Sequence, residues 1–526
     1  MSIFEELASH WGYTPVIAEG EGIHLLADAK VKAREHRCQL ALVDMRLVDD
    51  SDESDISGLD LIAQIKPASS IVVSGYGSAQ VAVQSIHEKG AVDFVGKEED
   101  PLSIKAKLQK EALKISAKER RLKISPTNVL DMIAATLFEP ALPAEYHDQI
   151  ADVFAQLFPE AHRLRLEKMN NILATDEVST APRPRSVVLK VYEDDLQPVI
   201  VKLARRHKVE KEVSRFLEYI DRRLVGNFIP VLGKHVELWD IGGIKLSYVG
   251  NIEQTFARFF QAQSVDKIQA CLEKFFTYTW SAHYKKIKKK SNISLFDLYC
   301  DVWGEDWYER AQNFQSPDPE KAMGKNLWGR IRAADPVEWL IKNTGKDKKS
   351  DVSRVGTAYL AVTHGDLHAD NLLVDDSQNA WVIDFERTGM GHALQDFIEI
   401  EFDIISRVAC ANENFPSFYR LCVAIAGSSR TGEIITDDPQ LADAETQKIL
   451  KTISIIRLLA EQCTHIEDSR QYLFGLFFNS IFRATIINAE THKRSQQRTL
   501  MLASILCHRL EHWDEPWPPD EWRDLP

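Results

Sequence analysis

The chain has 526 residues, of which 44% are hydrophobic and 27% are charged, and its 64 basic and 78 acidic residues give a formal net charge of −14. This length predicts more than one hydrophobic core, and the acidic balance argues against generic binding to nucleic acid or to an anionic membrane. Seven scattered cysteines without a C-x-x-C pair, an acidic N-terminal stretch and the lack of a long apolar run favour a cytoplasmic protein without disulfides, zinc or membrane helices.

The first 115 residues alternate between short apolar runs and amphipathic segments. Strands are predicted at residues 15–18, 38–45, 69–75 and 91–97, with helices of period 3.6 between and after them. Repeated βα units of this kind predict a parallel sheet in which functional groups collect at the carboxyl ends of the strands. Asp44, Ser74 and Lys97 stand at three such ends.

In the order and spacing of Asp44, Ser74 and Lys97, together with Gly58 in SGLDLI and the GAVDF run, residues 1–115 resemble the receiver domain of response regulators. The resemblance implies a flavodoxin-like parallel sheet in which Asp44 accepts a phosphoryl group, Ser74 binds it and Lys97 pairs with it. In receiver domains a first strand ends in an acidic pair that holds Mg²⁺, whereas Met1 falls where the first helix would begin. We therefore expect the first strand to be missing, and Asp44 is open to a second interpretation as a buried strand-end carboxylate.

For that reason we expect the receiver-like domain to act mainly by docking to a protein partner or by dimerisation. A true start upstream of Met1 is the alternative. Residues 116–160 are charged and then amphipathic, which predicts a helical connector. Its apolar residues at helical spacing, such as Val129, Ile133 and Leu137, are expected to serve packing or dimer contacts.

From residue 161 the pattern turns to strands. SVVLKVY and VIVKLA are joined by a DDLQP turn, which predicts a hairpin. Lys202 is the one basic residue within the second of these runs, and the following helix offers Glu210 and Glu212 as partners. A strand lysine paired with a glutamate on the next helix is an arrangement that binds nucleotide phosphates.

A dense polar loop, HGDLHADN, spans residues 364–371 and is followed by two short apolar runs and the string VIDFE. A hairpin there would bring Asp366 and Asn371 of the loop close to Asp384. Two carboxylates and a carboxamide are hard oxygen ligands that suit Mg²⁺. Phosphoryl transfer needs such a metal site, together with an aspartate that accepts or orients the proton of the attacking hydroxyl.

HGDLHADN and VIDFE resemble motifs of the aminoglycoside phosphotransferase and choline kinase family, small-molecule relatives of protein kinases. The resemblance implies catalytic Asp366, Mg²⁺ ligands Asn371 and Asp384, and Lys202 on the ATP phosphates. It also implies that Glu212 is the partner of Lys202, with Glu210 as the alternative. Asp396 would steady the loop, and His364 would be structural.

The implied fold is an α+β bilobal kinase-like fold with an enlarged helical lobe. The predicted domains are the receiver-like domain at 1–115, the helical connector at 116–160, the small lobe at 161–251, the large lobe at 252–508 with its catalytic loop at 364–371, and a Trp/Pro-rich tail at 509–526. Residues 236–251 resemble the strands that lead to the hinge for adenine. The lysines at 285–290 are expected on a solvated helix face, or alternatively against an anionic acceptor or partner. The tail is expected to dock on the kinase-like lobe, or else to bind a partner.

The preferred function is ATP- and Mg²⁺-dependent phosphoryl transfer to a hydroxyl of a small molecule, linked to a receiver-like regulatory domain. The absence of glycine from the turn at 172–186 keeps a second hypothesis open, that of a catalytically weak nucleotide-binding signalling scaffold. A protein kinase acting on a polypeptide is the third. The sequence identifies neither the acceptor nor the oligomeric state.

Overall fold

The structure is a computed structural model of the chain. It describes residues 3–49, 51–52, 54–75, 89–138, 143–168, 186–194, 196–224, 228–247, 252–304, 306–314, 335–345, 351–409, 415–433, 441, 443–487 and 493–523. Residues 172–185 of the turn without glycine lie outside the described residues.

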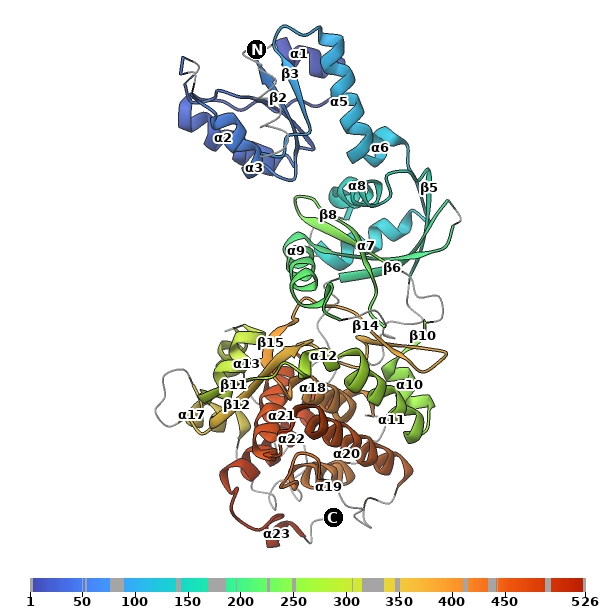
Figure 1. Cartoon of the computed structure of the whole chain (residues 1–526), viewed down its shortest axis with the longest axis vertical. Coiled ribbons are helices and arrows are strands. Elements are labelled where there is room, and N and C mark those ends of the chain that lie inside the picture. The colour runs from blue at the N-terminus through green and yellow to red at the C-terminus, as the bar shows by residue number, and fades with distance from the viewer. Residues whose placement is uncertain are drawn as a thin grey trace. The chain divides into compact units, whose positions relative to one another are not determined.

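The chain divides into two compact units, both drawn in Figure 1. Unit 1 comprises residues 1–168, 185–210 and 232–248, and unit 2 comprises residues 169–184, 211–231 and 249–526. Helix α9 (Arg206–Arg215) begins in unit 1 and ends in unit 2, where the π-helical turn η2 (Phe216–Ile220) follows it. The domain boundaries expected from the sequence stay predictions.

The N-terminal part of unit 1 is a three-stranded parallel sheet in the order β1-β2-β3. Its elements are α1 (Ile3–His10), α2 (Gly22–Glu35), β1 (Leu40–Asp44), α3 (Ser57–Gln64), β2 (Ser69–Ser74), β3 (Asp93–Gly96) and α5 (Pro101–Ile115). Five of the six residues of β2 are buried, as is typical of a parallel strand covered on both faces. The expected N-terminal parallel sheet is confirmed, whereas its receiver identity stays a prediction.

The strand expected at residues 15–18 is wrong, because this segment has no strand structure. The run is only four residues long, and its first residue, Pro15, has no backbone N–H to add to a sheet ladder. A four-residue apolar run therefore misled the prediction.

Residues 116–160 are mostly helical, as expected, and they form part of the core of unit 1. They contain α6 (Ala117–Arg120), β4 (Lys123–Ser125), α7 (Asn128–Phe138), the 3₁₀ turn η1 (Pro143–Tyr146) and α8 (His147–Leu157). A six-stranded sheet follows in the order β4-β5-β6-β7-β9-β8, with β5 (Arg163–Lys168), β6 (Ser186–Glu193), β7 (Val199–Arg205), β8 (Leu232–Glu237) and β9 (Ile241–Leu246). The strands after β5 pair in antiparallel fashion.

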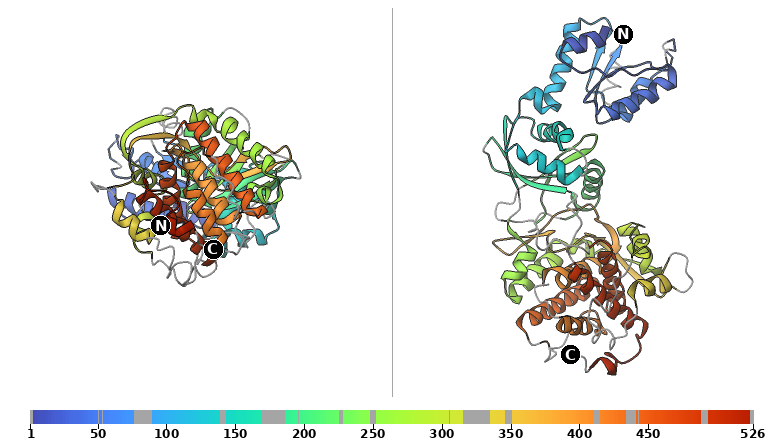
Figure 2. Two further views of the ribbon diagram at one scale, coloured as in Figure 1. Left: turned by 90° about the horizontal axis from the view of Figure 1, so that it is seen from below. Right: turned by 180° about the vertical axis from the view of Figure 1, so that it is seen from behind.

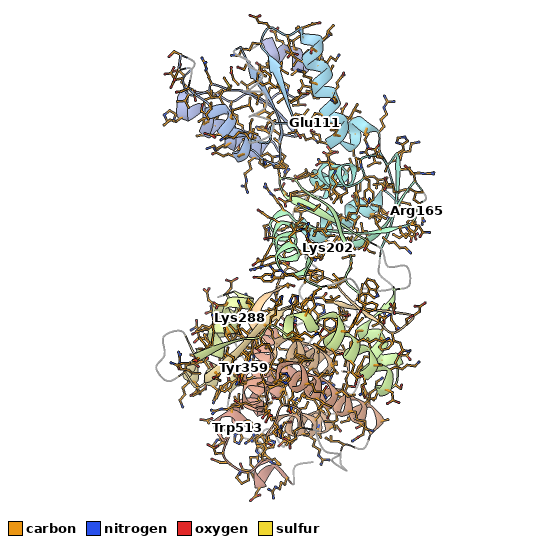
Figure 3. All side chains as sticks on the ribbon, in the orientation of Figure 1. Glu111, Arg165, Lys202, Lys288, Tyr359 and Trp513 are labelled. Carbon is orange, nitrogen blue, oxygen red and sulfur yellow. The ribbon has the colours of Figure 1, made fainter. Side chains whose placement is uncertain are left out.

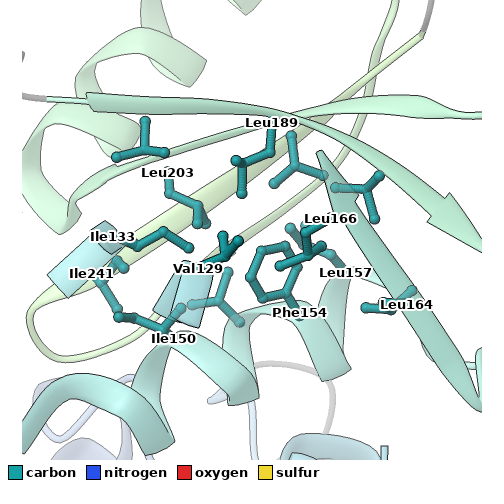
Figure 4. Packing of buried hydrophobic residues seen from close by; sticks show 14 of the residues in the cluster. Val129, Ile133, Ile150, Phe154, Leu157, Leu164, Leu166, Leu189, Leu203 and Ile241 are labelled. Carbon is teal, nitrogen blue, oxygen red and sulfur yellow. The ribbon is translucent and has the colours of Figure 1, made fainter. Parts of the chain in front are cut away.

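Helices α7 and α8 cover one face of this six-stranded sheet (Figure 4). Ile133 and Phe154 of the helices pack with Leu189 and Leu203 of the strands, and all four side chains are fully buried. Burial of one such side chain contributes about 1.5–3 kcal/mol to folding. The apolar face of the connector therefore serves packing, one of the two roles expected for it.

The N-terminal sheet is tied to the six-stranded sheet by polar contacts within unit 1. Arg37 Nε donates to Asp240 Oδ2 at 2.6 Å, and Trp239 Nε1 donates to the Cys38 carbonyl oxygen at 2.9 Å. Both contacts join the segment before β1 to the turn between β8 and β9. The two sheets therefore belong to one unit through side-chain hydrogen bonds as well as through chain connection.

Unit 2 is mainly helical and carries two three-stranded antiparallel sheets, β10-β13-β14 and β11-β12-β15. Up to its last sheet strand it contains β10 (Ile252–Thr255), α10 (Phe256–Ala262), α11 (Val265–Glu273), η3 (Lys274–Thr279), α12 (Ser281–Tyr284), β11 (Lys288–Ser294), α13 (Leu295–Trp303), α14 (Asp306–Gln312), α17 (Pro336–Asn343), β12 (Arg354–Thr363), β13 (Leu372–Asp375), β14 (Ala380–Val382) and β15 (Gly389–His392). The helices that follow are α18 (Gln395–Asp403), η4 (Ile404–Val408), α19 (Phe415–Ala426), α20 (Ala444–Thr464), α21 (Ser469–Ala484), α22 (Lys493–Glu511) and α23 (Asp520–Arg523). The expected helical C-terminal region is confirmed.

Helices α18, α20, α21 and α22 lie side by side in the orange to dark red part of the chain in Figures 1 and 2. A buried ion pair joins three of them. Arg457 of α20 and Glu401 of α18 are 1% and 0% exposed, with 2.7 Å between Arg457 Nη2 and Glu401 Oε1. Tyr472 of α21 donates its hydroxyl to Glu401 at 2.7 Å, and Arg457 Nη1 donates to Ser428 and to the Ile425 carbonyl oxygen. A buried charge pair is tolerated because its hydrogen bonds are satisfied in this way.

The lysine run was expected on a helix face, and that expectation is wrong for its second half. Lys288, Lys289 and Lys290 lie in β11, the edge strand of its sheet, and are exposed. Lysines on an edge strand discourage pairing with other chains, which gives the run a structural explanation.

The tail packs on unit 2, as expected. Trp517 Nε1 donates to the Val423 carbonyl oxygen at 2.9 Å, and Trp522 is 3% exposed against Tyr419 and His508. Arg509 lies over the ring of Trp513, which is labelled in Figure 3. Among the helices that the structure describes, none combines the length and apolar character needed to cross a membrane.

Candidate active site

The structure brings three of the predicted site residues together in unit 2. The polar loop, His364–Asn371, connects β12 to β13, and Asp384 follows β14. Asn371 donates its Nδ2–H to the Asp366 carbonyl oxygen at 2.9 Å, and Ile383 donates its backbone N–H to the Asn371 carbonyl oxygen at 3.1 Å. The antiparallel pairing of β13 with β14 therefore sets Asp384 next to the loop.

The side chains of Asn371 and Asp384 suit a divalent cation. The side-chain nitrogen of Asn371 is bonded within the loop, so its side-chain oxygen is the atom that could bind a metal ion. Asp384 adds a carboxylate as a second metal ligand. Asp384 has a φ of 70°, a left-handed conformation that is costly for a residue other than glycine and occurs often at functional sites. Within the described ranges, no group of three or more His, Cys, Asp or Glu side chains is placed to hold a metal ion. A full protein cage is not required for Mg²⁺, which often binds through one or two carboxylates plus substrate phosphates.

Asp366 lies between two arginines. Arg483 Nη2 of α21 is 3.0 Å from Asp366 Oδ1, and Arg387 Nη1 is 3.6 Å from the same oxygen. Burial alone would raise the pKa of Asp366, but the two guanidinium groups hold it below its usual range. Asp366 is therefore a carboxylate at neutral pH, as an acceptor of a hydroxyl proton must be.

Helix α18 holds the polar loop through three acidic side chains on one face. Asp396 accepts the backbone N–H groups of His364 at 2.9 Å and Gly365 at 3.1 Å. Glu399 accepts that of Leu367 at 2.6 Å, and Asp403 accepts that of Ala369 at 2.8 Å. The spacing of these acids, i, i+3 and i+7, places them on one stripe of the helix. The loop conformation is thus fixed by a rigid helix rather than by the loop alone.

The three acids of α18 differ in protonation. Burial raises the pKa of Asp396 to about 6 and, together with the neighbouring Asp396 charge, that of Glu399 to about 8. Burial would also raise the pKa of Asp403, but Arg407, 2.6 Å away, holds it at about 2. Arg407 also contacts Asp370 of the loop at 2.8 Å. Arginine therefore keeps Asp403 ionised, whereas burial favours the protonated forms of Asp396 and Glu399.

His364 is fully buried and its contacts are those of a structural residue. Its Nε2–H donates to the Ile383 carbonyl oxygen at 2.9 Å, and its ring packs against Trp280 and Phe385. Burial lowers the pKa of His364 to about 4, so the ring is neutral. Gly365 beside it has a φ of 79°, and a Cβ there would lie 2.5 Å from the Arg387 carbonyl oxygen. Only glycine fits this point of the loop.

Glu212 and Glu210 have different surroundings. Glu212 is 5% exposed and its Oε1 accepts the backbone N–H of Phe385 at 3.4 Å, directly after Asp384. Glu210 is exposed. Lys202 lies in unit 1, in the middle of β7, where it is 6% exposed. Its neighbours Val201 and Leu203 face the core, so the pleat directs Lys202 to the opposite face of the sheet. Its role and its partner stay predictions.

The N-terminal sheet places Asp44, Ser74 and Lys97 at one edge. Lys97 Nζ lies 2.5 Å from Asp44 Oδ2, and the Lys97 backbone N–H donates to the Ser74 carbonyl oxygen at 3.0 Å. Helix α3 approaches so closely that a Cβ on Gly58 would lie 1.8 Å from the Asp44 carbonyl oxygen. The three predicted residues therefore meet, while their part in phosphoryl chemistry stays a prediction.

Five charged residues that contact the polar loop were not predicted: Glu399, Asp403, Arg387, Arg407 and Arg483. The acids had a signal, because carboxylates that alternate with large apolar residues in one short helix are unusual unless they are paired. Arg387 stands close to Asp384 in the sequence without a pattern to mark it. Arg483 is 117 positions from Asp366, and only the folded chain brings the two together.

A separate pocket of about 490 Å³ lies between β12 and the segment that leads into α21. Its lining includes Arg354, Tyr359, His465, Arg470 and Phe474, and none of the polar-loop residues. Lys289 Nζ lies 5.3 Å from the Tyr359 ring centre, and Figure 3 labels Tyr359 together with the neighbouring Lys288. This pocket is therefore distinct from the candidate active site.

A comparison with known protein families finds a match in the part of the chain that carries the polar loop. A family model described as "Ternary complex associated domain 9" matches residues 320–481, a range that includes the polar loop, Asp384 and α18. No curated protein sequence matches the chain.

Solved structures of small-molecule kinases are similar at low identity. A thermostable mutant of the aminoglycoside phosphotransferase APH(4)-Ia, in a ternary complex with ADP and hygromycin B, is 10% identical and has a TM-score of 0.35, over 67% of this chain and 97% of its own. The ethanolamine kinase of Plasmodium vivax is 13% identical with a TM-score of 0.30, over 72% and 92% of the two chains. A macrolide 2′-phosphotransferase type I is 15% identical with a TM-score of 0.30, over 65% and 95%. The roles assigned to residues of this chain rest on the geometry described above.

Proposed function

We propose that the chain is an ATP- and Mg²⁺-dependent phosphotransferase that acts on a hydroxyl group of a small molecule. The observation that carries this proposal is the meeting of Asp366, Asn371 and Asp384 in one hydrogen-bonded loop and hairpin. Phosphoryl transfer requires positioning and charge neutralisation more than covalent chemistry, and this set supplies both.

In the proposed reaction, Asp366 accepts the proton of the acceptor hydroxyl as that oxygen attacks the γ-phosphorus of ATP. Asn371 and Asp384 would hold Mg²⁺, which neutralises charge on the phosphates when bound. Lys202 would contact the α- and β-phosphates. The acids of α18 hold the backbone of the loop, so that Asp366 has one position.

The direct test is release of ADP from ATP and Mg²⁺ by the full chain, with a panel of hydroxyl acceptors. Asp384→Asn and Asp366→Asn should each lower the rate by about 10³-fold or more, because each removes a group that acts on the transition state. Asp376→Asn is a matched control, since Asp376 is exposed in the turn of the same hairpin. Full turnover in Asp384→Asn would contradict the proposal. Nucleotide binding without turnover in the wild-type chain would favour the scaffold instead.

A protein partner is a further part of the proposal. The description of the matching family refers to a ternary complex, and the N-terminal parallel sheet is not needed for the chemistry at Asp366. We therefore assign residues 1–115 a docking role. Deletion of these residues should abolish association with a protein partner while ADP release persists. Circular dichroism checks that the remaining chain stays folded.

A further inference from the structure

Arg407 joins helix α18 to the end of the polar loop that carries Asn371. It lies in η4, directly after α18, and its side chain is 9% exposed. Its Nε and Nη2 donate to the two carboxylate oxygens of Asp403 at 2.7 and 2.6 Å, and its Nη1 is 2.8 Å from Asp370 Oδ2. One guanidinium group therefore holds two carboxylates, one from the helix and one from the loop.

The backbone beside Asn371 is held at the same place. Asp403 Oδ2 accepts the backbone N–H of Ala369 at 2.8 Å in addition to the bond from Arg407. Asn371 itself bonds within the loop and to the segment after β14, and it makes no hydrogen bond to α18 among the contacts that the structure describes. The links from α18 that lie nearest to Asn371 along the chain are therefore those at Ala369 and Asp370.

The turn that carries Arg407 is itself held by two other helices. Gln261 of α10 donates its Nε2–H to the Val408 carbonyl oxygen at 3.3 Å, and Ser495 of α22 donates its hydroxyl to the Ser406 carbonyl oxygen at 3.4 Å. The turn is π-helical, a form that occurs often at functional sites. Arg407 thus has a fixed base from which to hold Asp370.

We infer that Arg407 is a positioning residue for the proposed metal site, which it serves by holding Asp370 so that Asn371 presents its side-chain oxygen. This inference rests on the proposed function, and it concerns the binding of the metal and its nucleotide rather than the proton acceptor Asp366. Replacing a residue that supports a metal ligand commonly lowers metal affinity by about 10- to 100-fold. Arg407 also occupies the Asp370 carboxylate, which is a hard oxygen ligand next to Asn371 in the chain.

A purely electrostatic role of Arg407 would have the opposite sign. A guanidinium group repels a cation, so loss of its charge alone would tighten metal binding, whereas loss of positioning weakens it. Arg407→Lys keeps the charge but lacks the planar fork of donors that bonds both carboxylates. The lysine variant therefore separates the two roles.

The first test measures the affinity of the full chain for a fluorescent ADP analogue, once with Mg²⁺ and once with EDTA. In Arg407→Lys and Arg407→Gln the gain in affinity that Mg²⁺ provides should fall about tenfold, while the affinity in EDTA stays as in the wild type. Arg523→Lys, at an exposed position of α23, is the matched control and should keep the full gain. A gain that both Arg407 variants retain, or that increases in Arg407→Gln, would overturn the inference. Equal losses with Mg²⁺ and with EDTA would leave Arg407 a general structural role and would overturn it as well.

The second test asks whether Arg407 acts through Asp370. Asp370→Asn should lower the Mg²⁺-dependent gain as Arg407→Lys does, and the double variant should lose less than the two single losses combined, because both changes break one contact. Asp376→Asn, at an exposed position in the turn of the hairpin, should keep the gain. Losses that simply add in the double variant would show that the two side chains act independently, contrary to the inference.

Failure of the proposed function gives a different result. If Mg²⁺ adds nothing to the affinity of the wild-type chain for the ADP analogue, the metal site at Asn371 and Asp384 is wrong, and the inference is overturned together with the proposed function. If Asp384→Asn loses the gain while both Arg407 variants keep it, the metal site stands and the inference alone is overturned.

Discussion

Leu367 donates its backbone N–H to Glu399 Oε2 at 2.6 Å, and this bond ties the centre of the polar loop to helix α18. Asp396 and Asp403 make equivalent bonds on either side of it. The backbone on either side of Asp366 is consequently held by acidic side chains of a buried helix. Such support would suit the proposed phosphotransferase, because small errors in position cost large factors in rate.

Replacing Glu399 by alanine should destabilise the chain by about 1–3 kcal/mol, because the Leu367 N–H would be left buried without an acceptor. Chemical denaturation followed by circular dichroism measures this change. Glu338→Ala, at an exposed position of α17, is the control and should stay within about 0.5 kcal/mol of the wild type. Equal stabilities of the two variants would refute the role given to Glu399.

The contribution of Glu399 to stability should fall as the pH rises from about 4.5 to about 8. Burial and the neighbouring Asp396 raise the pKa of Glu399 from 4.5 to about 8, so the folded chain binds a proton that the unfolded chain has released. Its contribution is complete below about pH 4.5 and is lost as the pH rises toward 8, by about 1 kcal/mol per pH unit within that window. Denaturation at pH 6, 7 and 8 should show this slope, and Glu399→Gln should flatten it. A slope that persists unchanged in Glu399→Gln would assign the effect to other groups.

Lys202→Met should weaken ATP binding by about tenfold or more, because a buried lysine contact to the phosphates is lost. Lys190→Met is the control on the same sheet. Lys190 lies on β6, two residues from Val188, which pairs directly with Lys202. Fluorescence titration with a labelled ATP analogue gives both affinities. If Lys202→Met binds ATP as tightly as Lys190→Met and the wild-type chain do, Lys202 makes no contact with the phosphates.

Gly365→Ala should lower both stability and ADP release. Its φ of 79° is unfavourable for alanine, and the new Cβ would meet the Arg387 carbonyl oxygen at 2.5 Å. The expected cost is about 1–3 kcal/mol. Gly356→Ala, at the other end of β12, meets nothing within 4 Å and serves as the control. A fully active, fully stable Gly365→Ala chain would show that the loop is looser than the structure indicates.

The sequence predicted the strands around Lys202 and the polar loop, because apolar runs bounded by turns and the string HGDLHADN are local features. It did not reveal Arg483 beside Asp366, since a contact over 117 positions has no local pattern. The lysine run shows a second limit of prediction from sequence, this time for a local feature. Lys288–Lys290 are exposed on β11, and a row of exposed lysines has no periodicity that distinguishes strand from helix.

A change at the buried pair of Arg457 and Glu401 would affect the polar loop through helix α18. Glu401 stands on the helix that also carries Asp396, Glu399 and Asp403, yet its partner Arg457 makes no bond to the polar loop among the contacts that the structure describes. Loss of Arg457 would leave a carboxylate uncompensated in the core, at a cost of about 3–5 kcal/mol. Helix α18 could relieve that cost by shifting, and the four backbone amides that it holds would move with it. We therefore expect variation in the distant helix α20 to lower the proposed phosphotransferase activity while the residues proposed to contact ATP and acceptor are unchanged.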